Sequence, residues 1–380
     1  MVKIIKVDKI MSDEEISQME GEHFDESHYN IILNEDADVY TKEGRLLLKL
    51  RKNVISKKST DLALESLRDA AKKKHENRGA SAGVLDRNKM ANYIGDFVNP
   101  GKFRTKFVSA TSGIESNQAT SNLSPSNIIG YFDKPDRNLK GKGAPCRLTA
   151  FNRDHPELWE QTKPFLKEID EQFKKLVPEN YKLQHKRCQE TPNFAIDDTA
   201  FSTVTINYSW RTALHKDAGD FLDGFGNLLV IEDTANPNKY KGAYTGFPQY
   251  GVAANVRTGD FLAMDVHEWH SNTEFKSVNK NITGGAKEND VLNNWHFNRL
   301  SVVCYLREKM LNCKNMKDNR IQLLNTQNGG NSETNNTESI NKINNNKLDN
   351  DTENDILERI YTSLPKEYID FMNKEYGLFL

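Results

Sequence analysis

A histidine and an aspartate, His215 and Asp217, stand two positions apart directly after the alternating stretch at 201–214. In an extended chain, side chains at i and i+2 point to the same side, so this imidazole and carboxylate can be directed at one point. A second histidine would complete a 2-His-1-carboxylate facial triad, the open ligand set typical of non-haem Fe(II) oxygenases. An isolated pair of this kind is common on protein surfaces, so its interpretation depends on the surrounding segments.

Two further histidines, His267 and His270, end the segment GDFLAMDVHEWH at 259–270. The segment has the pattern of a turn followed by a buried strand, and the histidines come where that strand ends. Either histidine can supply the third ligand on this pattern alone.

An arginine, Arg299, opens the apolar stretch RLSVVCYL at 299–306. An arginine at the head of a buried strand is costly unless it meets an anion. A dicarboxylate cosubstrate would provide one, bound by the paired N–H groups of the guanidinium. Arg211 and Arg257 are the alternatives for this role. Asn207 and Tyr208, on the strand before His215, can contact the same cosubstrate or simply pack.

Short strands are predicted around these residues. Five apolar or alternating stretches between 200 and 310 are each bounded by Gly, Asn, Pro or Asp, and no helix-length segment separates them. This pattern indicates a β-sandwich or barrel, and no GxGxxG follows a strand as a Rossmann fold would require. Before them, IIGYFD at 128–133 is predicted to be a strand. A helix ended by Pro178 carries the apolar stripe Phe165, Leu166, Ile169, Phe173 and Leu176, which should pack on the sheet.

The two ends of the chain differ in amino-acid composition from this middle part. Residues 1–95 are polar and are predicted to form a mostly helical N-terminal extension, with one helix from Ser59 to Lys74. An oxygenase domain is predicted over 96–320. An Asn-rich stretch at 326–354 is expected to be a disordered linker, and 355–380 a C-terminal helical segment.

Bulk properties exclude several classes of protein. The 380 residues have a formal net charge of −2, so any nucleic-acid surface must be local. Four scattered cysteines without a CxxC pair argue against a zinc module and against a disulfide scaffold. The first residues lack the apolar segment of a secretory signal, and no 18-residue apolar run exists. We therefore expect an intracellular protein, in nucleus or cytoplasm, without membrane contact.

Four segments together resemble a known family, namely TVTINYSWRTALHKDAGD, GNLLVIED, GFPQYGVAANVRTGDFLAMDVHEWHSNT and NRLSVVCYLRE. They resemble the double-stranded β-helix 2-oxoglutarate oxygenases and are most similar to the TET and J-binding-protein (Tet_JBP) branch. The resemblance implies an α+β fold with a double-stranded β-helix, jelly-roll or cupin-like core and flanking helices. It also implies Fe(II), 2-oxoglutarate as cosubstrate, O2, and stimulation by ascorbate.

Carried onto this sequence, the resemblance assigns residue roles. His215 and Asp217 become iron ligands, and Arg299 pairs with the far carboxylate of 2-oxoglutarate, with Asn207 as a second cosubstrate contact. His270 is favoured as the distal ligand, because its distance from Gly259 and the small Ser271 after it match the superfamily pattern. His267 remains the alternative. The insert at 275–297 is longer than the family's hairpin and is expected to be a surface loop near the site.

The resemblance also implies a substrate, a methyl group on a pyrimidine of DNA, with 5-methylcytosine favoured over thymine. A base in a duplex must leave the stack to reach such a site. A basic loop from Lys134 to Arg147 could contact phosphates or simply be solvated, and Phe247, Tyr250 and Trp269 could form an aromatic wall or pack in the core. Two alternatives are a 2-oxoglutarate-dependent prolyl or lysyl protein hydroxylase, and a cupin-like binding module without turnover. The complete set of two histidines, aspartate and arginine argues against the second.

Overall fold

The computed structural model describes residues 2–75, 78–85, 103–104, 107–108, 115–116, 119–121, 124–133, 146–278 and 297–313. Three predictions fall outside these ranges: nearly all of the basic loop at 134–147, the linker at 326–354 and the helical segment at 355–380. Most of the insert at 275–297 lies outside them as well.

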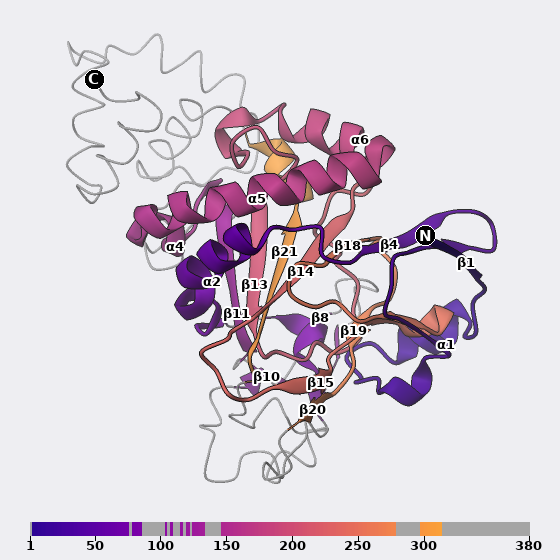
Figure 1. The fold of residues 1–380 in the computed structure, drawn as a ribbon. Helices are drawn as coiled ribbons and strands as arrows, with labels where there is room; N and C mark the ends of the chain where they lie inside the picture. The colour runs from indigo at the N-terminus through magenta and orange to yellow at the C-terminus, as the bar shows by residue number, and fades with distance from the viewer. Residues whose placement is uncertain are drawn as a thin grey trace, which may run out of the picture.

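A large sheet forms the centre of the molecule (Figure 1). Its strands are antiparallel except for the parallel pair β1 and β3 at one edge. A short strand, β5 (Lys74–His75), pairs with β11 beside the main path. The order across the sheet is β1 (Lys3–Val7), β3 (Ala37–Thr41), β4 (Leu46–Arg51), β18 (Phe261–Met264), β14 (Gly226–Glu232), β21 (Arg299–Tyr305), β13 (Thr203–Tyr208), β11 (Ser124–Phe132) and β12 (Arg147–Leu148).

A smaller sheet packs against one face of the large one. It consists of β19 (Ser271–Asn272), β16 (Thr245–Phe247), β17 (Val252–Ala254) and β2 (Ile31–Leu33), and a separate ribbon pairs β15 (Tyr240–Gly242) with β20 (Phe275–Ser277). One apolar cluster joins the two sheets, with Leu228, Val230 and Leu262 from the large sheet against Phe247 and Val252 from the small one. Two facing sheets with this apolar filling form the predicted double-stranded β-helix core.

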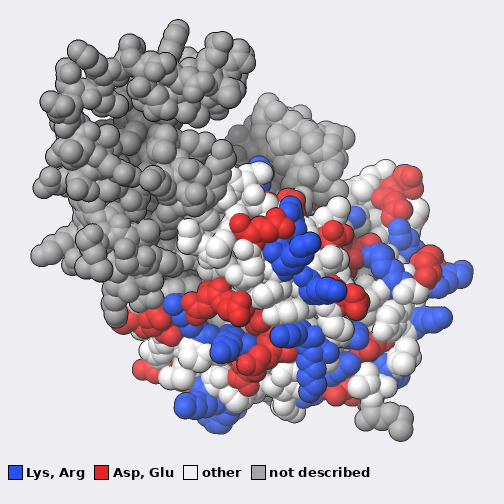
Figure 2. Space-filling view, turned by 90° about the horizontal axis from the view of Figure 1, so that it is seen from above, with Lys and Arg blue, Asp and Glu red and all other residues white. Residues whose placement is uncertain are grey.

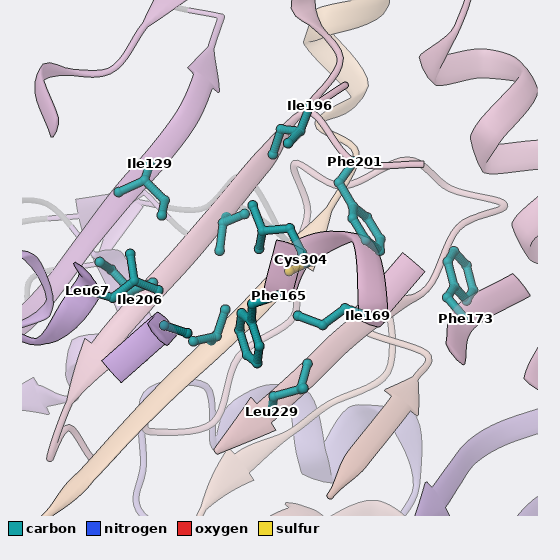
Figure 3. Close-up of a cluster of buried hydrophobic side chains, with 14 of the residues drawn as sticks. Leu67, Ile129, Phe165, Ile169, Phe173, Ile196, Phe201, Ile206, Leu229 and Cys304 are labelled. Carbon is teal, nitrogen blue, oxygen red and sulfur yellow. The ribbon is translucent and has the colours of Figure 1, made fainter. Parts of the chain in front are cut away.

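Helices cover the opposite face of the large sheet (Figure 1). They are α2 (Lys57–Ala71), α4 (Ala150–Asp154), α5 (Pro156–Leu176) and α6 (Pro178–Cys188). Figure 3 shows Phe165 and Ile169 of α5 close to Ile206, Leu229 and Cys304 of the sheet, all in one buried cluster. The predicted packing of the α5 stripe is confirmed, and Pro178 both ends that helix and occupies the first position of α6.

The two faces of the central strands carry different residue types. Along β13, Val204 and Ile206 join the cluster beneath the helices, whereas Thr205 and Asn207 point to the other side. Along β21, Val302 joins the same cluster, whereas its neighbours Ser301 and Val303 point to the other side. Because side chains alternate along a strand, the sequence of these strands creates one apolar face and one polar face.

The prediction of a mostly helical extension over 1–95 was wrong. The described part of this segment contributes β1, β3 and β4 to the large sheet and β2 to the small one. Besides α2, its described helices are short: α1 (Asp13–Gln18), η1 (Glu26–His28) and η2 (Gly79–Ala82). Leu48 and Leu50 of β4 are fully buried in the cluster between the sheets. Polar composition misled the prediction because turns and strand ends supply most of the polar residues. These strands share both sheets with strands of the core.

The cysteine prediction also needs correction. Cys146 and Cys313 form a disulfide with a Cα–Cα distance of 5.9 Å, and Cys188 and Cys304 are free and buried. The paired cysteines lie 167 positions apart, so no local spacing could have shown the link. Among the described residues, no helix is long and apolar enough to cross a membrane.

Candidate metal centre

Three ligand-type side chains meet at the polar face of the large sheet. One ligand atom from each of His215, Asp217 and His270 lies within 4.8 Å of the others. The Asp217 carboxylate stands between the two rings, with Oδ1 at 3.6 Å from Nε2 of His215 and Oδ2 at 3.7 Å from Nε2 of His270. Two imidazoles and one carboxylate around a common point form the donor set of a facial triad.

Backbone pairing brings the two histidines together. His215 and His270 are directly opposite each other in an isolated antiparallel bridge, and each N–H donates to the other's carbonyl at 3.0 Å. The Asp217 N–H donates to the Val266 carbonyl at 3.0 Å, a second backbone bond between the same two segments that lies outside the register of the bridge. Strand β13 ends at Tyr208, so the extended geometry that points His215 and Asp217 to one side comes from this bridge.

Hydrogen bonds determine which ring nitrogens are available. Nδ1 of His215 lies 2.8 Å from the Ala213 carbonyl, and Nδ1 of His270 lies 2.9 Å from the Glu268 carbonyl. A carbonyl can only accept, so each Nδ1 carries the proton and each Nε2 lone pair is directed toward the Asp217 side. Burial, with a contribution from His270, lowers the pKa of His215 to about 4, which keeps this ring neutral at pH 7. These residues therefore fit a divalent transition metal.

The competing histidine lies outside the cluster. Nε2 of His267 is 3.1 Å from the Phe221 carbonyl, and His267 is not one of the three residues whose ligand atoms converge. The geometry thus agrees with the preference for His270 over His267.

A cavity of about 270 Å³ adjoins the three side chains. Its wall includes inward-facing residues of β13 and β21, the loops after both strands and the η2 turn. The lining includes Thr205, Asn207, Trp210, Thr212, Ser301, Val303, Tyr305, Arg307, Asp220 and Arg78. The triad therefore borders a space with room for small ligands.

The residues predicted to bind the cosubstrate are distributed unevenly around this cavity. Asn207 lines it, and its Oδ1 is buried without a hydrogen-bond partner among the described residues. Tyr208 faces the helices instead, and its hydroxyl donates to Asp233 at 2.9 Å. Arg299 is fully buried but does not line the cavity, and its guanidinium lies over the Phe275 ring at 6.0 Å. Nε of Arg299 also has no hydrogen-bond partner within the described part of the chain.

The two alternative arginines are engaged elsewhere. Arg211 donates to the Phe24 carbonyl at 3.1 Å and to Asp25 at 2.7 Å. Arg257 forms an ion pair with Glu232 at 3.2 Å. Neither lines the cavity, so the structure does not bring them to the site.

Sequence reasoning missed two arginines on the cavity wall, Arg78 and Arg307. Arg307 donates through Nε to Asp133 at 2.7 Å, and it shares the alternation of Ser301 and Tyr305, a signal that could have identified it. Arg78 is in the segment predicted to be a polar extension, and no pattern in the sequence there indicates that it lines a cavity.

Burial, followed by the neighbouring Asp217, raises the pKa of Asp220 well above its usual range, and Arg78 and Arg307 oppose this shift.

The predicted aromatic wall is not part of the cavity. Phe247 and Tyr250 pack in the cluster between the sheets, and Trp269 packs in a separate cluster. The aromatic residues that line the cavity are Trp210 and Tyr305. The Trp210 indole N–H is buried without a partner among the described residues, and the Arg78 guanidinium lies 5.3 Å from its ring centroid.

Comparison with known proteins identifies the class to which this site belongs. Residues 127–308 match the family model described as the oxygenase domain of the 2OGFeDO superfamily. This part of the chain, which contains the triad and both central strands, thus matches an oxygenase domain of that superfamily, and the model is that of the Tet_JBP family. The match implies the use of Fe(II) and 2-oxoglutarate, in agreement with the donor set described above.

Curated relatives match about half of this chain. The bifunctional helicase and thymine dioxygenase JBP2 of Leishmania major is 34% identical over 184 residues, which are 48% of this chain and 14% of that protein. Thymine dioxygenase JBP1 of Trypanosoma brucei brucei is 33% identical over 182 residues, again 48% of this chain and 19% of that protein. The chain thus spans less than a fifth of the length of either relative. The solved structure of NgTET1 in complex with 5mC DNA aligns with a TM-score of 0.41 at 11% identity, over 83% of this chain and 100% of that one.

Proposed function

We propose that this protein is an Fe(II)- and 2-oxoglutarate-dependent dioxygenase that oxidises a methyl group on a pyrimidine base of DNA. The observation that carries the proposal is the convergence of His215, Asp217 and His270 beside a cavity within the segment that matches the Tet_JBP family model.

His215, Asp217 and His270 would hold the iron, each through the atom that already points at the common centre. When bound, the iron and 2-oxoglutarate together use O2 to hydroxylate a C–H bond, and ascorbate would keep the iron reduced. The protein contributes the two backbone carbonyls that hold the rings and the Val266 carbonyl that holds the Asp217 backbone. These contacts position all three ligands before the metal arrives.

Arg299 remains the proposed partner of the far carboxylate of 2-oxoglutarate. Supporting it are the complete burial of its guanidinium and the unpartnered Nε, since a buried cation without an anion is costly. Ser301, two positions further along the same face, already lines the cavity. Asn207 lines the cavity wall and is proposed as a further contact of the bound cosubstrate through its side-chain amide N–H, because the oxygens of 2-oxoglutarate can only accept.

The substrate is proposed to enter from the side of the cavity that carries Arg307, Asp220 and Tyr305. A base must be extruded from the duplex to reach a buried centre. An aromatic ring can stack on such a base, while an arginine and a carboxylate can pair with its polar edge. The curated relatives are named thymine dioxygenases. Their names favour thymine, the reverse of the order expected from the sequence, so both bases belong in the test.

The surface that contacts DNA must be local. Lys and Arg are interspersed with Asp and Glu over the described residues of the face seen in Figure 2, so this view shows no continuous basic field. Binding should depend on a few phosphate contacts near the cavity and weaken as salt rises.

A protein side chain is the second candidate substrate, because the triad and the cosubstrate site would serve a prolyl or lysyl hydroxylase equally well. The deciding experiment incubates the protein with Fe(II), 2-oxoglutarate, ascorbate and duplexes containing thymine or 5-methylcytosine, followed by digestion and mass spectrometry. We expect hydroxymethyl bases from at least one duplex and none with His215→Ala. Unmodified DNA together with turnover on a peptide library would assign the enzyme to the protein hydroxylases.

A further inference from the structure

The turn between β18 and the distal histidine supports two of the three proposed ligands. The Val266 carbonyl accepts the Asp217 N–H, and the Glu268 carbonyl accepts Nδ1–H of His270. Within the turn, the Glu268 N–H donates to the Asp265 carbonyl at 3.3 Å, and the Asp265 carboxylate accepts the His267 N–H at 3.1 Å. A displacement of the Asp265–Glu268 turn would therefore move both Asp217 and His270.

One arginine holds both ends of this turn from outside. Arg45 donates through Nη1 to the Asp265 carboxylate and through Nη2 to the Glu268 carboxylate. Nη2 also lies 3.3 Å from the Tyr250 hydroxyl, which in turn lies 3.3 Å from the second Glu268 oxygen. Asp265 and Glu268 are largely shielded from solvent, with side-chain exposures of 14% and 16%. The two carboxylates would repel each other without the shared guanidinium between them.

The sequence around Arg45 explains why it can reach the turn. Arg45 immediately precedes β4, and β4 pairs antiparallel with β18, so the start of one strand meets the end of the other. The Asp265 N–H donates to the Leu47 carbonyl at 2.9 Å, which continues this pairing up to the turn. Arg45 lies outside the segment 127–308 that matches the family model.

We propose that Arg45 is a positioning residue for the metal centre: by bridging Asp265 and Glu268 it holds the turn whose carbonyls orient Asp217 and His270. The N-terminal strands thereby complete a site whose ligands all come from the oxygenase domain. This inference rests on the proposed metal site.

The test measures metal affinity directly. Mn(II) and Co(II) are titrated into the metal-free full chain by calorimetry, and the Co(II) visible spectrum reports ligand geometry. Partners that orient metal ligands typically change affinity by about 10–100-fold when removed. Because Arg45 acts one contact further out, we expect Arg45→Ala to bind roughly tenfold more weakly, with an altered Co(II) spectrum. Arg45→Lys should recover only part of the affinity, since an ammonium cannot bridge two carboxylates as a fork.

Arg51 provides the matched control on the same strand. It pairs with Asp38 at 2.7 Å, both side chains are largely buried, and it pairs in register with Phe261 at the far end of β18 from the turn. Arg51→Ala should lower the melting temperature more than Arg45→Ala does, because Arg45 is 46% exposed, yet should leave metal affinity unchanged. Glu268→Gln removes the negative charge from the other side of the bridge but keeps an accepting oxygen, so it should weaken metal binding less than Arg45→Ala does.

Three outcomes separate the possibilities. Equal metal affinity in wild type, Arg45→Ala and Glu268→Gln overturns the inference while the metal site stands. Equal losses in Arg45→Ala and Arg51→Ala also overturn it, because general destabilisation would then explain both. Absence of 1:1 metal binding by the wild type would overturn the inference and the proposed function together.

Discussion

The inner face of the large sheet has two regions that differ in residue type. Where β4, β18 and β14 lie, Leu48, Leu262 and Val230 point inward and pack against the small sheet in one apolar cluster. Where β21 and β13 lie, inward positions are held by polar residues such as Ser301 and Asn207, and a cavity opens. The helices cover the outside of both regions with one continuous apolar cluster.

This contrast shows how one sheet can serve two purposes. The apolar region binds the two sheets together through burial, which is the main favourable contribution to folding. The polar region would lose stability if it were dry and unfilled, since buried polar groups without partners are costly. The unpartnered atoms of Asn207, Trp210 and Arg78 lie there, and ligands would satisfy them. Function is therefore expected where the apolar pattern stops.

The largest effect is expected in the polar region at the triad. His215→Ala, Asp217→Ala and His270→Ala should each reduce metal binding and succinate formation to background, because each removes one of three protein ligands. His267→Ala should keep measurable activity, since His267 lies outside the cluster. Succinate assays at saturating 2-oxoglutarate compare the four variants. Activity in His270→Ala combined with its loss in His267→Ala would transfer the distal role to His267.

In the apolar region, truncation should affect stability and leave the site intact. Leu262 is fully buried between the sheets, so Leu262→Ala should lower the free energy of unfolding by about 2–5 kcal/mol. Urea denaturation measures this loss, and metal titration of the folded variant should give the wild-type affinity. A large loss of metal affinity in folded Leu262→Ala would mean that the two regions are not separable.

A smaller effect distinguishes the buried arginines of the polar region. Arg299→Lys keeps the charge but loses the bidentate geometry, so the KM for 2-oxoglutarate should rise by about 10-fold or more. Arg78→Lys, on the cavity wall, should mainly raise the KM for DNA. Steady-state kinetics with each substrate varied in turn separates the two. If Arg78→Lys changed the 2-oxoglutarate KM and Arg299→Lys did not, the cosubstrate role would move to Arg78.

The parts of this account that were predictable depend on local pattern. His215 and Asp217 are two positions apart, and the α5 stripe repeats within one helix, so both could be identified from neighbouring residues alone. The family spacing favoured His270 over His267, but the bridge that brings His270 opposite His215 links distant segments and has no local signal. The aromatic character of Phe247 and Trp269 did not show that they pack in the apolar clusters instead of lining the cavity.

The remaining errors also have physical causes. Of the N-terminal strands, β1 and β2 lie at sheet edges and β3 and β4 lie inside the large sheet, an arrangement that composition alone could not show. Arg78 reaches the cavity from the η2 turn, a placement determined only by the tertiary fold. The disulfide between Cys146 and Cys313 joins segments that no sequence spacing relates.

The most direct test of the central claim measures succinate and oxidised base in the same reaction. Oxidation of one C–H bond consumes one O2 and converts one 2-oxoglutarate to succinate and CO2, so a first oxidation step coupled to this site should give the two products in a 1:1 ratio. We expect this ratio with the wild-type protein on duplexes containing thymine or 5-methylcytosine, and neither product with Asp217→Ala. Oxidised base formed equally well by Asp217→Ala, or succinate formed without any oxidised base on either duplex, would contradict the account.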